Sequence, residues 1–196
     1  MTRSAQQHRQ TLETDIEVYL ALDGQGQADI DTGLGFLDHM LTLLARHAGF
    51  DLTVKAIGDL QVDGHHTVED VGIVLGQALA HALGDKRGIG RYGHSVVPMD
   101  EALLEAVVDI SGRPYLVYEV GLHGPVVGDF DTQLTEEFFR ALAFNAGLTL
   151  HLSCRYGKND HHMIEGLFKA LARALAIAVR IDPARAGQIP STKGVL

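Results

Sequence analysis

The sequence predicts an α+β fold built by tandem duplication of one unit, with helices packed on one face of a mixed, mostly antiparallel sheet. Two segments carry this prediction, LDHMLTLLARHAGFDLTVKA at 37–56 and TEEFFRALAFNAGLTLHLSC at 135–154. Each has an acidic start, an apolar helical run, an Ala-Gly stop and an alternating strand pattern. Each is followed by HHxxE and a second helical pattern. Recurrence of this order indicates an internal repeat.

The first half begins with a strand in DIEVYLALD at 15–23, where alternate residues are apolar and a DGQG turn follows. Apolar residues then keep helical spacing over 40–48 until Gly49, which is a good helix terminator. The pattern alternates again over 52–56. A second helix is expected in GIVLGQALAHALG at 72–84.

In the second half, strands are expected in LLEAVVDI at 103–110 and PYLVYEV at 114–120, on either side of SGR. The repeated unit follows, with a helix that ends at Gly147, a strand over 148–154 and a last helix in GLFKALARALAIAVRI at 166–181. The C-terminal tail, 184–196, has neither period. We therefore expect a single pseudo-symmetric domain over 1–196, with halves of roughly 1–90 and 91–190.

Composition narrows the class of function. The 46% hydrophobic content is enough for a buried core, and the formal charge of -9 comes without a basic block, so a nucleic-acid partner is not expected. No apolar run approaches the ~20 residues that span a bilayer, so we expect a soluble, cytoplasmic protein with no membrane partner. Cys154 is the only cysteine and lies in a strand pattern, where a buried role is expected.

The two HHxxE motifs, His65-His66-x-x-Glu69 and His161-His162-x-x-Glu165, predict metal binding. On a helix the first histidine and the glutamate lie four residues apart on one face, where they can hold one cation. The second histidine points ~100° away and suits a different ion. Such ligands fit Mn, Fe, Zn, Co or Ni rather than Ca or Mg.

A single HH pair at a helix edge is most often a capping or surface pair, and its recurrence in register is what favours metal. Alignment of Gly49 with Gly147 places His39 opposite Glu137, each in the first turn of a helix, as additional candidate ligands. The alternative for Glu137 is an acid favoured by the helix dipole.

Three cations stand in loop-like settings of this acidic chain, Arg91, Arg113 and Lys193, and together they suggest a phosphate-binding group. The motif GIGRYG around Arg91 formally matches G-x-G-x-x-G. It follows a helix rather than a strand, so a dinucleotide-binding role is excluded by context.

Seven motifs, in this order, cover nearly the whole chain: GFLDHML, DGHHTVEDVGI, DKRGIGRYG, PMDEAL, DISGRPYL, NDHHMIEGLFKALARAL and PSTKGVL. With these motifs the sequence resembles the imidazoleglycerol-phosphate dehydratases of histidine biosynthesis. The resemblance implies a duplicated ribosomal-S5-domain-2-like fold and two Mn2+ ions per active site. It also implies a homo-oligomer of twenty-four subunits, with active sites at subunit contacts.

The resemblance also implies roles for individual residues. His39, His66, His161 and Glu165 would hold one ion, while His65, Glu69 and His162 would hold the other. Substrate contacts would come from Glu13, His39, His65 and His161, and phosphate contacts from Arg91, Arg113, Ser191 and Lys193. Glu13, Glu69 and Glu165 would be the catalytic carboxylates, with Glu13 serving the proton transfers. The family commonly has histidine where this chain has Glu137, which either substitutes as an oxygen ligand or leaves this site one ligand short.

Two other classes of function fit a pair of metal sites. A dinuclear metal hydrolase would use a bridging carboxylate and a metal-bound water as nucleophile, and would turn over esters or amides. A non-catalytic assembly would use the ions only to hold subunits together.

Overall fold

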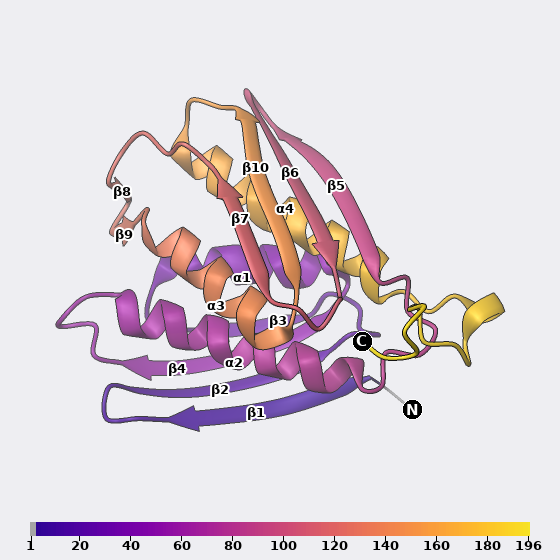
Figure 1. Cartoon of the computed structure of the whole chain (residues 1–196). Helices are drawn as coiled ribbons and strands as arrows, with labels where there is room; N and C mark the ends of the chain where they lie inside the picture. The colour runs from indigo at the N-terminus through magenta and orange to yellow at the C-terminus, as the bar shows by residue number, and fades with distance from the viewer. Residues whose placement is uncertain (1–2) are drawn as a thin grey trace.

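Two sheets enclose the helices in the computed structural model, which describes residues 3–196 (Figure 1). The first sheet has the order β1-β2-β4-β3 and contains β1 (Ser4–Gln10), β2 (Thr14–Ala21), β3 (Ala28–Asp31) and β4 (Asp51–Gly58). The second has the order β5-β6-β10-β7 and contains β5 (Tyr92–Met99), β6 (Ala102–Asp109), β7 (Tyr115–Glu119) and β10 (Thr149–Tyr156). In each sheet the last strand of this order is parallel to its neighbour and the other pairs are antiparallel.

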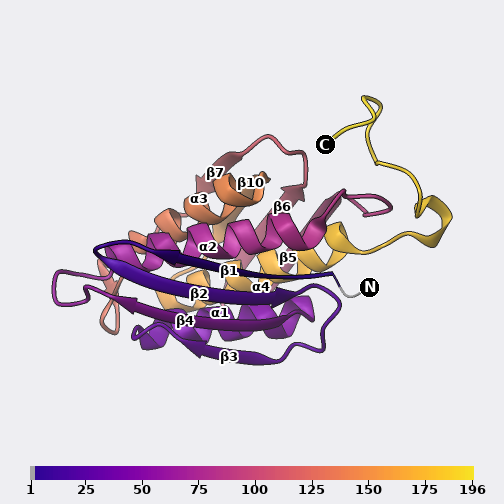
Figure 2. The ribbon, with the colours of Figure 1, turned by 90° about the horizontal axis from the view of Figure 1, so that it is seen from below.

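Four helices occur in the described residues: α1 (Gly35–Ala48), α2 (His65–Leu83), α3 (Leu134–Ala146) and α4 (Asp160–Val179). They lie between the two sheets, and the view from below shows the first sheet spread across one side of them (Figure 2). The short strands β8 (Val126–Val127) and β9 (Phe130–Asp131) precede α3, and the 3-10 helix Pro183–Arg185 lies in the C-terminal tail.

The helices pair across the repeat. α1 of the first half packs against α4 of the second, and α2 of the first half packs against α3 of the second. Each strand gives one face to this interior: in β2, for example, Ile16, Val18 and Leu20 are buried while Glu17 and Tyr19 are exposed. Because helices cover only one face of each sheet, the sequence shows clear alternation in the strands that were predicted.

The predicted α+β class is confirmed, and the repeated unit recurs as two sheet-and-helix halves. Strands β1, β3, β5, β8 and β9 were not predicted. The strand β1 has the sequence SAQQHRQ, and none of its side chains is fully buried. Because an edge strand of polar residues has no alternation of apolar and polar residues, periodicity cannot detect it. None of the helices within residues 3–196 combines the length and apolar character needed to cross a bilayer.

Two glycines on one face of α2 set the distance between α2 and α3. A Cβ placed on Gly72 would lie 2.8 Å from both the Phe138 carbonyl oxygen and the Ala141 Cβ. A Cβ on Gly76, one turn later, would lie 2.8 Å from the Leu142 carbonyl oxygen. These obstacles include backbone atoms of α3, so the helices cannot keep their present spacing if either glycine gains a side chain.

We expect Gly72→Ala to destabilise the protein by about 1–3 kcal/mol, the usual cost of overpacking, which outweighs the ~1 kcal/mol gain in helix propensity. Gly35→Ala is the matched control, because a Cβ on this exposed residue at the start of α1 meets nothing within 4 Å. Denaturant unfolding measures both variants. Equal stability of Gly72→Ala and Gly35→Ala would show that the α2–α3 spacing is not constrained in this way.

Candidate metal centre

The second HHxxE motif lies in the first turns of α4, whose start is fixed by a side-chain cap. The Asn159 side chain accepts hydrogen bonds from the backbone N–H groups of His161 and His162. Helix α2 has no side-chain cap at its N-cap residue Gly64, but the Asp63 carboxylate one residue earlier accepts the backbone N–H of His65 at 2.8 Å. In both motifs a side chain just before the helix thus binds the backbone N–H of the first histidine.

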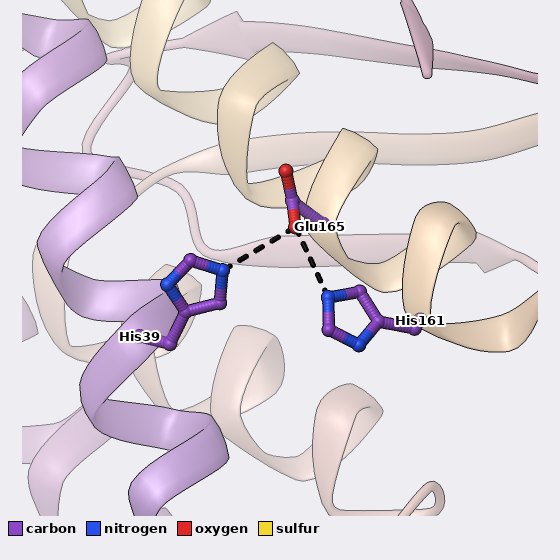
Figure 3. Close-up of side chains that lie close together, drawn as sticks. All are labelled: His39, His161 and Glu165. Atoms are coloured by element: carbon purple, nitrogen blue, oxygen red, sulfur yellow. Dashed lines mark hydrogen bonds and ion pairs between the residues drawn. The ribbon is translucent and has the colours of Figure 1, made fainter. Parts of the chain in front are cut away.

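His39, His161 and Glu165 form one cluster, in which all three ligand atoms lie within 4.8 Å of one another. Glu165 Oε2 is 3.1 Å from His161 Nε2 and 3.4 Å from His39 Nε2 (Figure 3). His39 comes from α1 and the other two from α4, so the cluster joins the two halves of the chain.

This cluster fits a transition-metal ion. Nitrogen and oxygen ligands bind such an ion at about 2.0–2.2 Å, so two ligands at a right angle lie about 3 Å apart. The contacts of Glu165 with the two imidazoles have this spacing, and two nitrogens with one carboxylate oxygen are a donor set that divalent transition metals accept.

The carboxylate of Glu165 is buried, and its other oxygen, Oε1, accepts a bond from Lys169 Nζ at 2.5 Å. Burial opposes ionisation, but Lys169 and the two imidazoles hold the pKa of Glu165 below its usual value. Lys169 therefore keeps the group charged and leaves Oε2 directed at the imidazoles. The sequence analysis missed Lys169, although its position one helical turn after Glu165 was a usable signal.

His47, assigned no role from sequence, lies on α1 near the same region. Burial lowers the pKa of His47, and the nearby Lys169 and Arg173 lower it further. The side chains of Lys169 and Arg173 thus place positive charge near His47.

In the first motif, His65 Nε2 lies 3.9 Å from Glu69 Oε2, as expected for residues four apart on a helix. His65 and Glu137 line one cavity of about 550 Å³, between the start of α2 and the start of α3. Glu137 also lies 3.7 Å from the Arg140 guanidinium. The structure therefore places Glu137 on the side of the first motif, as His39 lies on the side of the second.

The second histidine of each pair points elsewhere. His66 Nδ1 lies 3.0 Å from Asp59, and its Nε2 lies 3.9 Å from Glu13 in the β1–β2 turn. The hydrogen bond to Asp59 raises the pKa of His66. Within the described chain, His66 does not join the cluster around Glu165.

His162 has a similar setting. Its Nδ1 lies 2.7 Å from Glu101, a bond that raises the pKa of His162 and, together with backbone N–H donors, lowers that of Glu101 to about 2. Sequence reasoning missed Asp59 and Glu101, since both lie outside the motifs and no spacing rule connects them to the histidines.

Of the four residues predicted to bind phosphate, only two line the same cavity. Arg91 and Ser191 line a cavity of about 470 Å³ with Arg185. The Arg91 guanidinium forms two bonds with Asp109, at 2.7 and 3.2 Å, and a third to the Pro190 carbonyl oxygen.

Arg113 and Lys193 do not line this cavity. The Arg113 guanidinium is exposed and lies 3.7 Å from the same Asp109 carboxylate that binds Arg91. The backbone N–H of Lys193 donates to the Ser191 hydroxyl at 3.2 Å. The structure therefore brings together Arg91 and Ser191 at one cavity and places Arg113 beside the Asp109 carboxylate that Arg91 also binds.

Together, the duplicated fold and the His–His–Glu cluster define an α+β protein with a candidate transition-metal centre shared by its two halves. A family model described as imidazoleglycerol-phosphate dehydratase matches residues 32–175. The chain belongs to the imidazoleglycerol-phosphate dehydratase family, whose members are lyases of histidine biosynthesis.

Individual relatives agree with this assignment. The chain is 63% identical to the imidazoleglycerol-phosphate dehydratase of Gluconobacter oxydans, covering 100% of this chain and 98% of the relative. It is 61% identical to that of Acidiphilium cryptum, with 100% of both covered. Among solved structures, the enzyme of Staphylococcus aureus has a TM-score of 0.84 and 46% identity, over 91% of this chain and 99% of that one. The Pyrococcus furiosus enzyme has a TM-score of 0.82 and 37% identity, over 97% and 100%.

We expect His161→Ala to weaken Mn2+ binding by at least about tenfold, because it removes one donor of the cluster and loss of an outer-shell partner alone costs about 10–100-fold. Free Mn2+ measured by electron paramagnetic resonance during a titration gives the affinity. His151→Ala is the control, since His151 is an exposed residue of β10. Unchanged affinity in His161→Ala would remove His161 from the ligand set.

Proposed function

We propose that the protein is a manganese-dependent dehydratase that converts imidazoleglycerol phosphate to imidazole-acetol phosphate, with two Mn2+ ions in each active site. The observation that carries the proposal is the His39–His161–Glu165 cluster, placed by helices of both halves in a chain that matches its relatives over its full length. The names of those relatives support the substrate and the reaction.

The reaction removes water from two adjacent carbinol carbons, breaking one C–H and one C–O bond, and the resulting enol becomes the ketone. The C–H bond is not acidic, because no carbonyl lies next to it. Bound manganese would supply Lewis acidity at the imidazole ring of the substrate and would orient it. His39, His161 and Glu165 would hold one ion, and His65 with Glu69 would contribute to the other.

The other proposed ligands are His66, His162 and Glu137. Glu137 lies at the cavity that His65 lines, which supports a place near the ion of the first motif. A carboxylate there supplies an oxygen in place of an imidazole nitrogen, and both bind borderline divalent metals.

Glu13 would be the group that moves protons. Its carboxylate is about half exposed at the β1–β2 turn and lies 3.9 Å from His66 Nε2, so it stands at the edge of the proposed site and open to a ligand. An ionised carboxylate oxygen can accept the proton from the carbinol carbon and return it later in the reaction. Arg91, Arg113, Ser191 and Lys193 would bind the phosphate of the substrate through charge-assisted hydrogen bonds.

The active sites would be completed at contacts between subunits, in an assembly of twenty-four chains. His66 lies away from the Glu165 cluster in one chain, so a copy from another subunit would have to supply this ligand. The exposed apolar side chains of Leu12, Ile57 and Val62 support this arrangement, since they lie at the end of the first sheet that carries Glu13. An apolar surface beside a binding site is typical of a protein interface.

Removal of divalent metal with a chelator should abolish the dehydration of imidazoleglycerol phosphate, and added Mn2+ should restore this activity. Native mass spectrometry of the same samples should show an oligomer whose mass does not change while the activity returns. Activity that persists in metal-free protein would contradict the proposal. Turnover of esters or amides without dehydration would favour a hydrolase instead.

Glu13→Gln should keep its Mn2+ affinity and lose about 10²–10⁴-fold in kcat, the usual contribution of a positioned acid–base group. Glu17→Gln is the control, because Glu17 is an exposed carboxylate of β2 whose contact is with Gln6. A Glu13→Gln enzyme with full metal content and most of its turnover would take the proton-transfer role away from Glu13.

A further inference from the structure

The second histidine of each HHxxE motif makes one firm bond to a carboxylate outside the motif, and in both cases the bond is at Nδ1. In the first half, His66 Nδ1 lies 3.0 and 3.2 Å from the two oxygens of Asp59. In the second half, His162 Nδ1 lies 2.7 Å from Glu101 Oε2. The two halves therefore present these imidazoles in the same way.

We infer that Asp59 and Glu101 are positioning residues that hold Nδ1–H of His66 and His162 and leave Nε2 of each ring free to bind metal. This inference rests on the proposed metal function. A neutral imidazole carries one N–H, so a bond from Nδ1–H to a carboxylate places the lone pair on Nε2. Metal-binding histidines are commonly oriented in this way by a partner on the other nitrogen.

The two carboxylates come from positions that are not equivalent in the repeat. Asp59 directly follows β4, whereas the residue that directly follows β10 is Gly157. Gly157 has no side chain, and a Cβ there would lie 2.6 Å from Met163 Cγ and 3.1 Å from Ala102 Cβ, so a carboxylate at this position would require these neighbours to shift.

Glu101 reaches His162 from a different place, the turn between β5 and β6. Two different loops thus deliver the same contact to equivalent histidines. Duplication of an ancestral unit does not explain why both histidines have a carboxylate at Nδ1, because the two carboxylates come from different loops. A common need to orient both imidazoles does explain it. The exposed Nε2 atoms remain open, with the nearest carboxylates at 3.9 Å for His66 and 3.7 Å for His162.

Asp59 is the better residue for a test. Within residues 3–196, the hydrogen bonds of its carboxylate are those to His66. Glu101 also accepts the backbone N–H groups of Lys158 and Asn159, at 3.1 and 2.8 Å, so its removal would disturb the start of α4 as well.

The experiment measures Mn2+ affinity by titration of the full-length protein at fixed pH, together with thermal unfolding of the metal-free form. Asp59→Ala should weaken binding of one ion by about 10–100-fold. Asp59→Asn keeps an oxygen that accepts Nδ1–H, so it should bind more tightly than Asp59→Ala. The matched control is Asp15→Ala, which removes a 2.6 Å carboxylate contact from His8, a histidine outside the proposed ligand set.

The outcomes separate this inference from the proposed function. If the wild-type protein binds no Mn2+, both fail together. If it binds Mn2+ and Asp59→Ala binds equally well, the inference alone is overturned. Equal weakening in Asp59→Asn and Asp59→Ala, or weakening explained by a matching loss of metal-free stability, also overturns the positioning role.

Discussion

The buried carboxylate of Glu165 is the group on which the arrangement of the candidate centre depends. A charge in the protein interior is tolerated only when it is paired, and this one has Lys169 on one oxygen and two imidazoles on the other. One imidazole is in its own helix and the other in α1. Packing of α1 against α4 is therefore needed to bring the last of these partners, His39, to the carboxylate. The same packing brings the three candidate metal ligands together.

The pairing of helices across the repeat explains why each candidate centre draws on both halves. Helix α1 packs on α4 and carries His39 to the second motif, while α3 packs on α2 and carries Glu137 to the cavity beside the first. Each half of the chain thus contributes one candidate ligand to the motif of the other half. Each group of candidate ligands comes from both halves, since each motif and its additional candidate ligand lie on opposite halves of the chain.

Periodicity and spacing were enough to predict the class of fold, the four helices, the strands β2, β4, β6, β7 and β10, and the pairing of histidine with glutamate on one helix face. Alignment of Gly49 with Gly147 also pointed to His39, which lies in the cluster with Glu165, because both helices end at an equivalent left-handed glycine. Asp59 and Glu101 could not be found in this way. They reach their histidines through turns whose paths depend on packing, and the close approach of Met163 and Ala102 to Gly157 is visible only in three dimensions.

Adjacent histidines on a helix diverge by about 100°, which has a consequence for the size of the functional unit. When His161 faces Glu165, His162 must face away toward the β5–β6 turn, and its Nε2 then points out of the cluster. The same holds for His66 beside His65. Each chain therefore contains the candidate cluster around Glu165, and the second histidine of each pair has an Nε2 atom that lies outside this cluster. Because the two side chains of an HH pair diverge on the helix, they do not serve the same cluster. This geometry is compatible with the proposed assembly, in which a second copy of the chain would supply the other ligands.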